Sequence, residues 1–278
     1  MNQFRAVMLC FALIALGYAQ GQTPKPIEPL STAQLEKIES TVKAWMAQSK
    51  APALSVALVT DDQLRWAKGY GWADVENRVA AQPDTAYRLA SIAKTLTAVA
   101  VLQLVEQGKL KLDEPIHSYC AAYPAQQKFK DTAYAITLRQ LLVHQSGVRH
   151  NRFDETNTTK HYATINDAIA SFKDDPLVSE PETKYSYSTP GYTLLGCAIE
   201  TASGLSYFDY LREHILKPAG MTRTFVDDVY ALIPQRARGY RNTAGGEIQN
   251  APLHDTSIKC RAAEFVSRPF RLRESAAN

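Results

Sequence analysis

The segment from Leu89 to Leu102 constrains the fold more than any other part of the chain. It reads LASIAKTLTAVAVL, and apolar residues occupy nearly every side of the helix that this segment predicts. A helix that is apolar on most sides has to be buried among other helices or against a sheet. Lys94 is the one charged residue of this run, so the sequence places an amine in the predicted core.

Ser91 and Lys94 are spaced for chemistry as well as for burial. Side chains three residues apart lie on the same face of a helix. Burial disfavours a charged ammonium, which makes a lysine here a candidate base for a serine one turn away. Ser40 and Lys43 share the S-x-x-K spacing. They lie off the apolar stripe of the predicted helix 31–49, which predicts that they are solvated surface residues.

Residues 1–19 have the features of a signal peptide. A positively charged start precedes the apolar stretch 6–16, and the small residues Gly17 and Ala19 stand where a signal peptidase cleaves. The apolar stretch is too short for a stable membrane anchor. We therefore expect a periplasmic or secreted protein, with residues 20–30 as a leader ahead of the first helix.

Charge and histidine spacing exclude two classes of partner. The formal net charge of +3 is small, and no basic helix or mixed aromatic and basic face indicates nucleic acid. The six histidines form no H-x-H-x-D or H-E-x-x-H group, so we expect no metal site. No pattern indicates an organic cofactor, and none defines the oligomeric state.

The cysteines leave two alternatives open. The chain has four, of which Cys10 lies in the predicted signal peptide, so Cys120, Cys197 and Cys260 remain after cleavage. A bridge between Cys120 and Cys197 is one alternative. An odd number without the spacing of a disulfide framework favours the other, free buried thiols.

The order of predicted elements is helix, hairpin and then mainly helices. Helix 31–49 begins with a capping box, and segments 53–60 and 64–73 alternate as two strands of a hairpin. A hairpin alone is marginal and needs further strands or a packed helix. This order predicts an α+β architecture with an incomplete sheet. Capped helices are expected from Thr137 to Val143, from Thr164 to Phe172, from Pro190 to Thr201, and from Ser206 to just before Pro218.

Two polar clusters lie outside the first serine and lysine. Segment 185–192 carries several hydroxyl groups ahead of a buried helix. A tyrosine beside an ammonium favours its phenolate, which can accept a proton from a serine. Taken alone, however, this cluster favours a turn that caps the helix. His144 and Ser146 likewise favour a structural turn over a nucleophile and its base, because no G-x-S-x-G elbow occurs.

Three segments together resemble the serine β-lactamase and penicillin-binding superfamily. Segment 88–94 is similar to its S-x-x-K box, and segment 141–147 to its L-L-x-H-x-S-G turn. Tyr187-Ser188-Thr189 is similar to its Y-x-N box in a variant that ends in threonine. The likeness runs in order over 35–259 and is greatest to the class C-like branch, which includes mitochondrial β-lactamase-like serine proteases.

The resemblance implies a fold and a mechanism. The fold is β-lactamase/transpeptidase-like, an antiparallel sheet flanked by helices with an inserted helical lobe. Ser91 would attack a carbonyl, with Lys94 and Tyr187 relaying its proton and Thr189 binding substrate where an asparagine is usual. Which of the two is the acylation base stays open. The implied activity is that of an exported serine hydrolase on β-lactams, D-alanyl peptides, other peptides or esters.

The C-terminal part departs from the family pattern. No K-T-G or H-x-G box follows Tyr187, and residues 260–278 show neither a helical nor an alternating apolar period. Our hypothesis is a reading-frame change near Lys259, which leaves an incomplete domain over 31–259 without its late strands. We then expect poor folding and weak activity. The alternative function is a non-catalytic remnant that binds a ligand or a partner.

Overall fold

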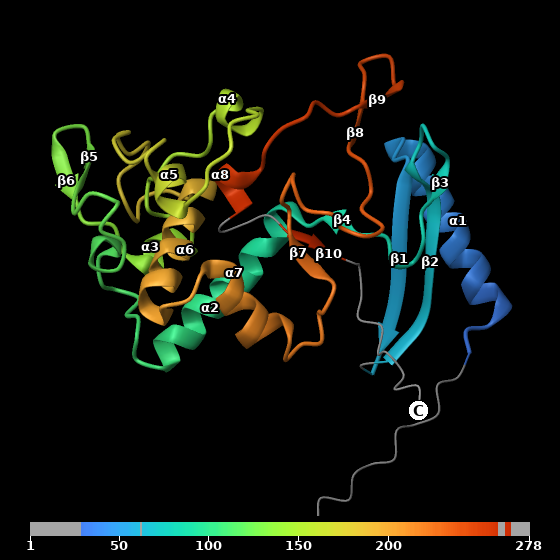
Figure 1. Cartoon of the computed structure of the whole chain (residues 1–278), viewed down its shortest axis with the longest axis horizontal. Helices are drawn as coiled ribbons and strands as arrows, with labels where there is room; N and C mark the ends of the chain where they lie inside the picture. The colour runs from blue at the N-terminus through green and yellow to red at the C-terminus, as the bar shows by residue number, and fades with distance from the viewer. Residues whose placement is uncertain (1–28, 62, 261–264, 268–278) are drawn as a thin grey trace, which may run out of the picture.

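Most of the helices gather at one end of the molecule, and a long hairpin stands at the other with helix α1 (Thr32–Ser49) beside it (Figure 1). The computed structural model describes residues 29–61, 63–260 and 265–267. The predicted signal peptide 1–19 lies outside the described residues, as do most of the predicted leader and most of the tail. The α+β class predicted from the order of elements is confirmed.

The described elements are short apart from α1, β1, β2, α2 and α6. The helices are α1 (Thr32–Ser49), α2 (Lys94–Glu106), α3 (Leu138–Leu142), α4 (Phe153–Thr156), α5 (Ile165–Ile169), α6 (Thr189–Ser203), α7 (Tyr207–Leu211) and α8 (Ser257–Cys260), with single turns η1 (Ala90–Ala93), η2 (Ile116–Ser118) and η3 (Arg212–Leu216). The strands are β1 (Ala53–Thr60), β2 (Gln63–Asp74), β3 (Val79–Ala80), β4 (Tyr87–Arg88), β5 (Gln127–Phe129), β6 (Thr132–Tyr134), β7 (Thr224–Val226), β8 (Tyr240–Asn242), β9 (Ile248–Asn250) and β10 (Phe265–Ser267).

Several element boundaries predicted from local sequence signals agree with the structure. Ser31 and Gln34 form the expected capping box of α1. The hairpin pairs β1 with β2 from Ala53 opposite Gly71 to Thr60 opposite Gln63. The caps predicted for α3, α5 and α7 are also present. Helix α5 is shorter than predicted, since it ends at Ile169 and turns follow.

A second small sheet leads the chain into the first helix of the core. Its order is β4-β10-β7, so β10 is the central strand. Phe265 of β10 is fully buried and packs against the rings of Tyr207 and Phe208. Its carbonyl accepts the Leu89 N–H at 2.7 Å, just before Ser91. Sequence patterning did not predict this strand, because three residues are too few to show a period.

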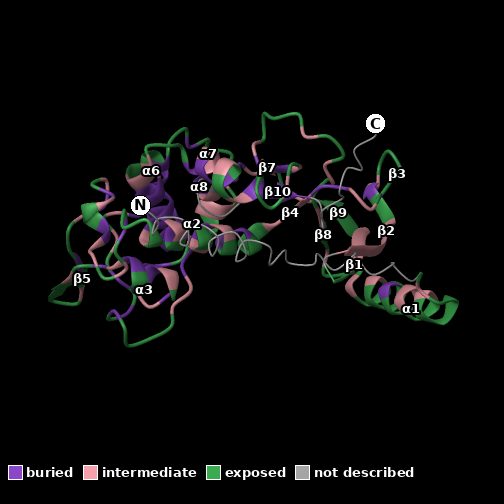
Figure 2. Cartoon of the chain, turned by 90° about the horizontal axis from the view of Figure 1, so that it is seen from below, coloured by how far each residue is buried: buried purple, intermediate pink, exposed green. Residues whose placement is uncertain are grey.

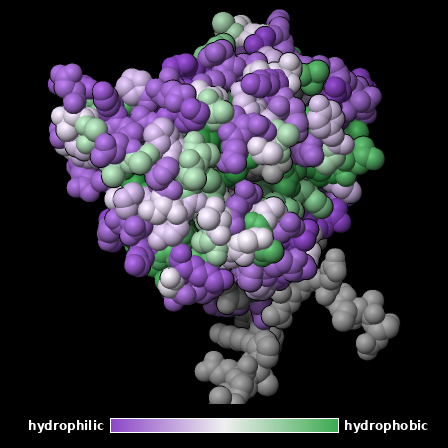
Figure 3. All heavy atoms as spheres, turned by 60° about the vertical axis from the view of Figure 1, so that its left-hand side comes forward, coloured by the Kyte–Doolittle hydropathy of each residue, from purple (hydrophilic) through white to green (hydrophobic). Residues whose placement is uncertain are grey.

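Helices α2 and α6 pack together at the centre of the helical lobe. Figure 2 shows buried residues concentrated in this half of the molecule, while the outer face of the lobe in Figure 3 is largely hydrophilic. The side chains with no exposed area include Ala100, Val101, Leu104, Leu194, Leu195, Ala198, Ile199 and Leu211. The apolar character of α6, predicted as a buried helix, is explained by this packing.

The predicted burial of α2 on nearly every side is wrong for one stripe. Val99 and Leu102 of α2 are 44% and 46% exposed, and Ile92 of the preceding η1 is 67% exposed. Besides the adjoining η1, the elements that pack most on α2 are α6, α7 and η3, and its buried residues lie on the opposite side of the helix. Apolar composition records which side chains favour burial, but it does not decide which face a neighbouring element covers.

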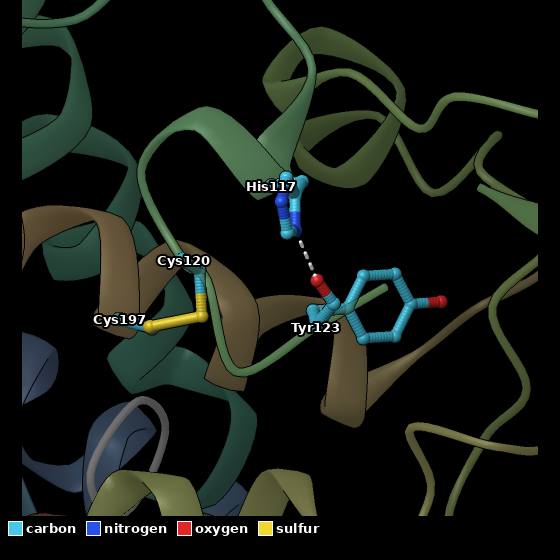
Figure 4. Close-up of a disulfide and its surroundings, with 4 residues drawn as sticks. All are labelled: His117, Cys120, Tyr123 and Cys197. Atoms are coloured by element: carbon cyan, nitrogen blue, oxygen red, sulfur yellow. Dashed lines mark hydrogen bonds between the residues drawn. A yellow bond between two sulfur atoms is a disulfide. The ribbon is translucent and has the colours of Figure 1, made fainter. Parts of the chain in front are cut away.

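The prediction of free thiols at Cys120 and Cys197 is wrong. The two residues form a disulfide with their Cα atoms 5.6 Å apart (Figure 4), a separation typical of such bridges. Cys120 follows η2 and Cys197 lies in α6, and both are buried. Their separation of 77 residues hides the contact from sequence spacing. The side chain of Cys260 lies outside what the structure describes.

Reduction of this disulfide is expected to destabilise the protein by about 4 kcal/mol, because the bridge closes a long loop in the unfolded chain. Urea unfolding with and without a phosphine reductant measures the difference. The Cys120→Ala/Cys197→Ala double variant is the control, since the reductant should leave its midpoint unchanged. Equal midpoints for the wild-type chain in both conditions would contradict the prediction.

None of the helices in the described part of the chain combines the length and apolar character needed to cross a bilayer.

Candidate active site

Ser91 lies on a tight turn between β4 and α2. Ala90, which precedes it, has φ of +46°, a conformation that costs a residue with a Cβ free energy. Residues 90–93 form a 3₁₀ turn, in which side chains three apart eclipse one another. This turn brings Lys94 Nζ to 3.3 Å from Ser91 Oγ, with which it hydrogen-bonds. Ser91 is exposed, whereas Lys94 is only 6% exposed.

Tyr187 reaches the same serine from a distant part of the chain. Its phenol donates a hydrogen bond to Ser91 Oγ at 2.6 Å. Lys94 Nζ lies 5.1 Å from the centre of the Tyr187 ring and 5.5 Å from that of Tyr192. The structure therefore brings together Ser91, Lys94 and Tyr187, the three residues that the sequence selected.

The environment of Tyr187 favours its phenolate. Burial raises the pKa of the phenol, but its hydrogen bonds with Lys94 and Ser91 and the charge of Lys94 outweigh the effect of burial, so the pKa lies below its usual value of 10. A phenol with a lowered pKa gives up its proton more easily near neutral pH. In that form it is able to accept a proton from the serine hydroxyl.

Thr189 lies at the first turn of α6, directly beside this group. It is 5% exposed, and its hydroxyl hydrogen-bonds to Tyr187 and helps to lower the pKa of the phenol. Its N–H donates to His150 Nδ1 at 3.3 Å. The structure thus places Thr189 against the predicted catalytic tyrosine, and its role as a substrate ligand stays a prediction.

His144 and Ser146 do not form a nucleophile and base. Ser146 is 1% exposed, and its hydroxyl accepts the Val148 N–H at 3.2 Å within the turn. The interpretation as a structural turn fits this geometry. His144 and His150 both contact the tyrosine segment, which the sequence did not predict. The available sequence signal was two histidines on either side of Gly147. In the structure Gly147 has φ of +74° and turns the loop.

The second S-x-x-K match is a surface feature, as predicted. Ser40 Oγ donates to the Lys37 carbonyl at 3.0 Å. The Lys43 side chain is 70% exposed and pairs with Glu39 at 3.5 Å. The two matches therefore differ in surroundings, not in spacing.

The described residues contain no group of three or more His, Cys, Asp or Glu arranged to hold a metal ion.

Two curated proteins are similar in sequence to most of this chain. The chain is 29% identical to the human serine beta-lactamase-like protein LACTB, mitochondrial, in an alignment that covers 88% of this chain and 56% of that protein. It is also 29% identical to protein flp of Staphylococcus aureus (strain MW2), over 80% of this chain and 44% of that protein. The chain spans about half the length of these curated relatives.

Solved structures show the same fold. The octameric penicillin-binding protein homologue from Pyrococcus abyssi is 30% identical with a TM-score of 0.70, covering 84% of this chain and 53% of that chain. The D-amino acid amidase from Ochrobactrum anthropi SV3, complexed with L-phenylalanine amide, is 26% identical with a TM-score of 0.72, covering 85% and 67%. These likenesses confirm the β-lactamase/transpeptidase-like fold.

The family model described as Beta-lactamase matches residues 38–263. This match covers most of the chain, including the turn of Ser91 and the segment of Tyr187. Together with the relatives and the fold, it establishes that the chain is a member of the Beta-lactamase family.

Proposed function

We propose that this chain is a serine hydrolase that acts through an acyl-enzyme on amide or ester bonds. One observation carries the proposal: Ser91 Oγ accepts hydrogen bonds from both the Tyr187 phenol, at 2.6 Å, and Lys94 Nζ, at 3.3 Å. The serine is exposed, so a carbonyl carbon has access to it. A hydroxyl is a weak nucleophile until a neighbouring base accepts its proton.

In the proposed reaction Ser91 Oγ bonds to the substrate carbonyl carbon, and its proton passes to the Tyr187 and Lys94 pair. That pair then donates a proton to the leaving amine or alcohol as its bond to carbon breaks. Water hydrolyses the acyl-enzyme by the same steps in reverse. Which member of the pair is the acylation base stays open, since both contact the serine oxygen.

The proposed substrate is a small molecule or a peptide. The names of the relatives at 26% and 30% identity, a D-amino acid amidase and a penicillin-binding protein homologue, support amide substrates. β-lactams, D-alanyl peptides, other peptides and simple esters all belong to the class that this mechanism attacks.

We also propose that the protein is periplasmic or secreted. The Cys120–Cys197 disulfide supports this location, since such bridges persist in oxidising compartments.

A fluorophosphonate probe tests the proposal by covalent labelling. Labelling is a sharper readout than turnover, because the probe bonds directly to the oxygen of the proposed nucleophile. Trypsin releases Ser91 in peptide 89–94 and Ser40 in peptide 38–43. Mass spectrometry should find the label on the first peptide and none on the second. No label, with either this probe or a fluorescent penicillin, would favour the non-catalytic binding role.

A further inference from the structure

Two histidines of the loop after α3 hold the backbone around Tyr187. His144 Nδ1 accepts the Ser188 N–H at 3.1 Å, the His144 carbonyl accepts the Ser186 N–H at 2.7 Å, and His150 Nδ1 accepts the Thr189 N–H at 3.3 Å. Three N–H groups on the two sides of Tyr187 are thus bound by two residues. A hydrogen bond on each side of a residue limits the rotation of its backbone.

The imidazole rings also contact the phenol ring itself. The His144 ring centre lies 4.4 Å from that of Tyr187 in a tilted arrangement. The His150 ring centre lies 5.3 Å away and meets the phenol edge to face. Ring pairs at these separations attract one another and resist sliding. Both the backbone and the ring of Tyr187 are therefore restrained by these histidines.

The loop that carries His150 is itself anchored. Arg149 is buried and pairs with Glu155 at 2.6 Å and Asp175 at 2.5 Å. Its Nη1 donates to the His150 carbonyl at 3.0 Å, and its own carbonyl accepts the Ser188 hydroxyl at 2.8 Å. A charge-assisted network of this kind is a rigid support. His150 is thus placed by contacts that do not depend on Thr189.

We propose that His144 and His150 are positioning residues for Tyr187, and that protonation of His150 releases the tyrosine segment and slows acylation of Ser91. The inference rests on the proposed function. Each Nδ1 accepts an N–H, so each imidazole is neutral with its proton on Nε2. Protonation puts an N–H on Nδ1 facing another N–H, which removes the hydrogen bond.

The surroundings of both histidines oppose their protonation. Desolvation lowers the pKa of His150, and the charges of Lys94, Lys259 and Arg149 lower it further against the opposing effect of Glu155. Desolvation, Lys94 and His150 lower the pKa of His144 to about 4. Both groups are neutral at pH 7. Acid therefore protonates His150 only below its ordinary pKa of 6.5, and a comparison with a residue at position 150 that does not titrate separates its effect from that of His144.

Two substitutions at His150 separate positioning from charge. His150→Asn places an amide oxygen near the position of Nδ1, so it keeps an acceptor that does not titrate. His150→Phe keeps a ring beside Tyr187 and removes the acceptor. His214→Asn is the control, since His214 is exposed and its ring packs on Tyr210. The readout is the rate constant of Ser91 labelling by the fluorophosphonate from about pH 5 to about pH 8.

The ratio of the wild-type rate to the His150→Asn rate isolates the effect of His150, because the other titratable groups of the site are common to both chains. We expect this ratio to be constant above about pH 7 and to fall several-fold as the pH decreases below the ordinary imidazole pKa of about 6.5. His150→Phe should label about tenfold more slowly than wild type above about pH 7, and the difference should narrow in acid as wild type loses the same hydrogen bond. His214→Asn should match wild type throughout.

A ratio that stays flat across the range overturns the inference but leaves the proposed function standing, since Ser91 is still labelled. Wild-type rates for His150→Phe, or equal losses in the Asn and Phe variants above pH 7, overturn it as well. If circular dichroism shows that the Phe variant does not fold, the ratio for the Asn variant decides alone. Absence of labelling at any pH in the wild-type chain removes the proposed function, and the inference with it.

Discussion

Ser91→Ala is expected to abolish covalent labelling of the chain by a fluorophosphonate, while Ser40→Ala leaves it unchanged. The two serines share the S-x-x-K spacing. Only Ser91 has its oxygen within hydrogen-bond distance of both a phenol and an amine, whereas the Ser40 hydroxyl donates to a helix carbonyl. Removal of the oxygen removes the only atom on which the proposed acyl-enzyme forms. In-gel fluorescence of both variants, beside wild type, measures the effect.

The Ser91 variant should remain folded, which makes its loss of labelling interpretable. Ser91 is exposed, and alanine is compatible with a helical turn. Thermal unfolding should therefore agree with wild type within a few degrees. Persistent labelling of Ser91→Ala at the wild-type rate would mean that another nucleophile reacts, and the assignment of Ser91 would be wrong.

Lys94→Met is expected to slow labelling of Ser91 by about 10²- to 10⁴-fold, the usual range for loss of a positioned acid or base. Methionine keeps much of the apolar stem of the lysine in its buried site and removes only the amine. Without the ammonium, the pKa of Tyr187 rises towards its ordinary value, so the phenol also becomes a poorer proton acceptor at neutral pH. One substitution thus weakens both members of the pair.

Lys43→Met is the matched control, because Lys43 occupies the same place in the surface S-x-x-K match and its side chain is largely exposed. Its labelling rate should equal that of wild type. The second-order rate constant, measured over a series of probe concentrations, compares the two variants. A Lys94→Met rate within about threefold of wild type would show that the amine does not take part in acylation.

Several features were predictable because they depend on neighbouring residues. The capping boxes of α1, α3 and α5, the hairpin of β1 and β2, and the spacing of Ser91 and Lys94 are all local. Hydrogen bonds across three residues and side chains on one helical face follow from backbone geometry alone. The motifs that resembled the superfamily are also runs of a few residues, and the family match agrees with them.

Other features could not be predicted because they join segments far apart in the chain. The disulfide links residues separated by 77 positions, and β10 pairs with two strands from other regions. The same applies to His144 and His150, which looked like parts of a turn until the fold placed the tyrosine segment against them. Such contacts depend on which packed arrangement the whole chain adopts.

The sequence by itself determined the helices and hairpin, the family, and the two residues of the first motif. The tertiary structure alone decided which thiols pair, that the Tyr187 phenol lies within hydrogen-bond distance of Ser91, and that His144 and His150 contact the tyrosine segment. The physical reason is that spacing along a helix is a property of consecutive residues. The surroundings that change the reactivity of a side chain are supplied by segments that only folding brings together.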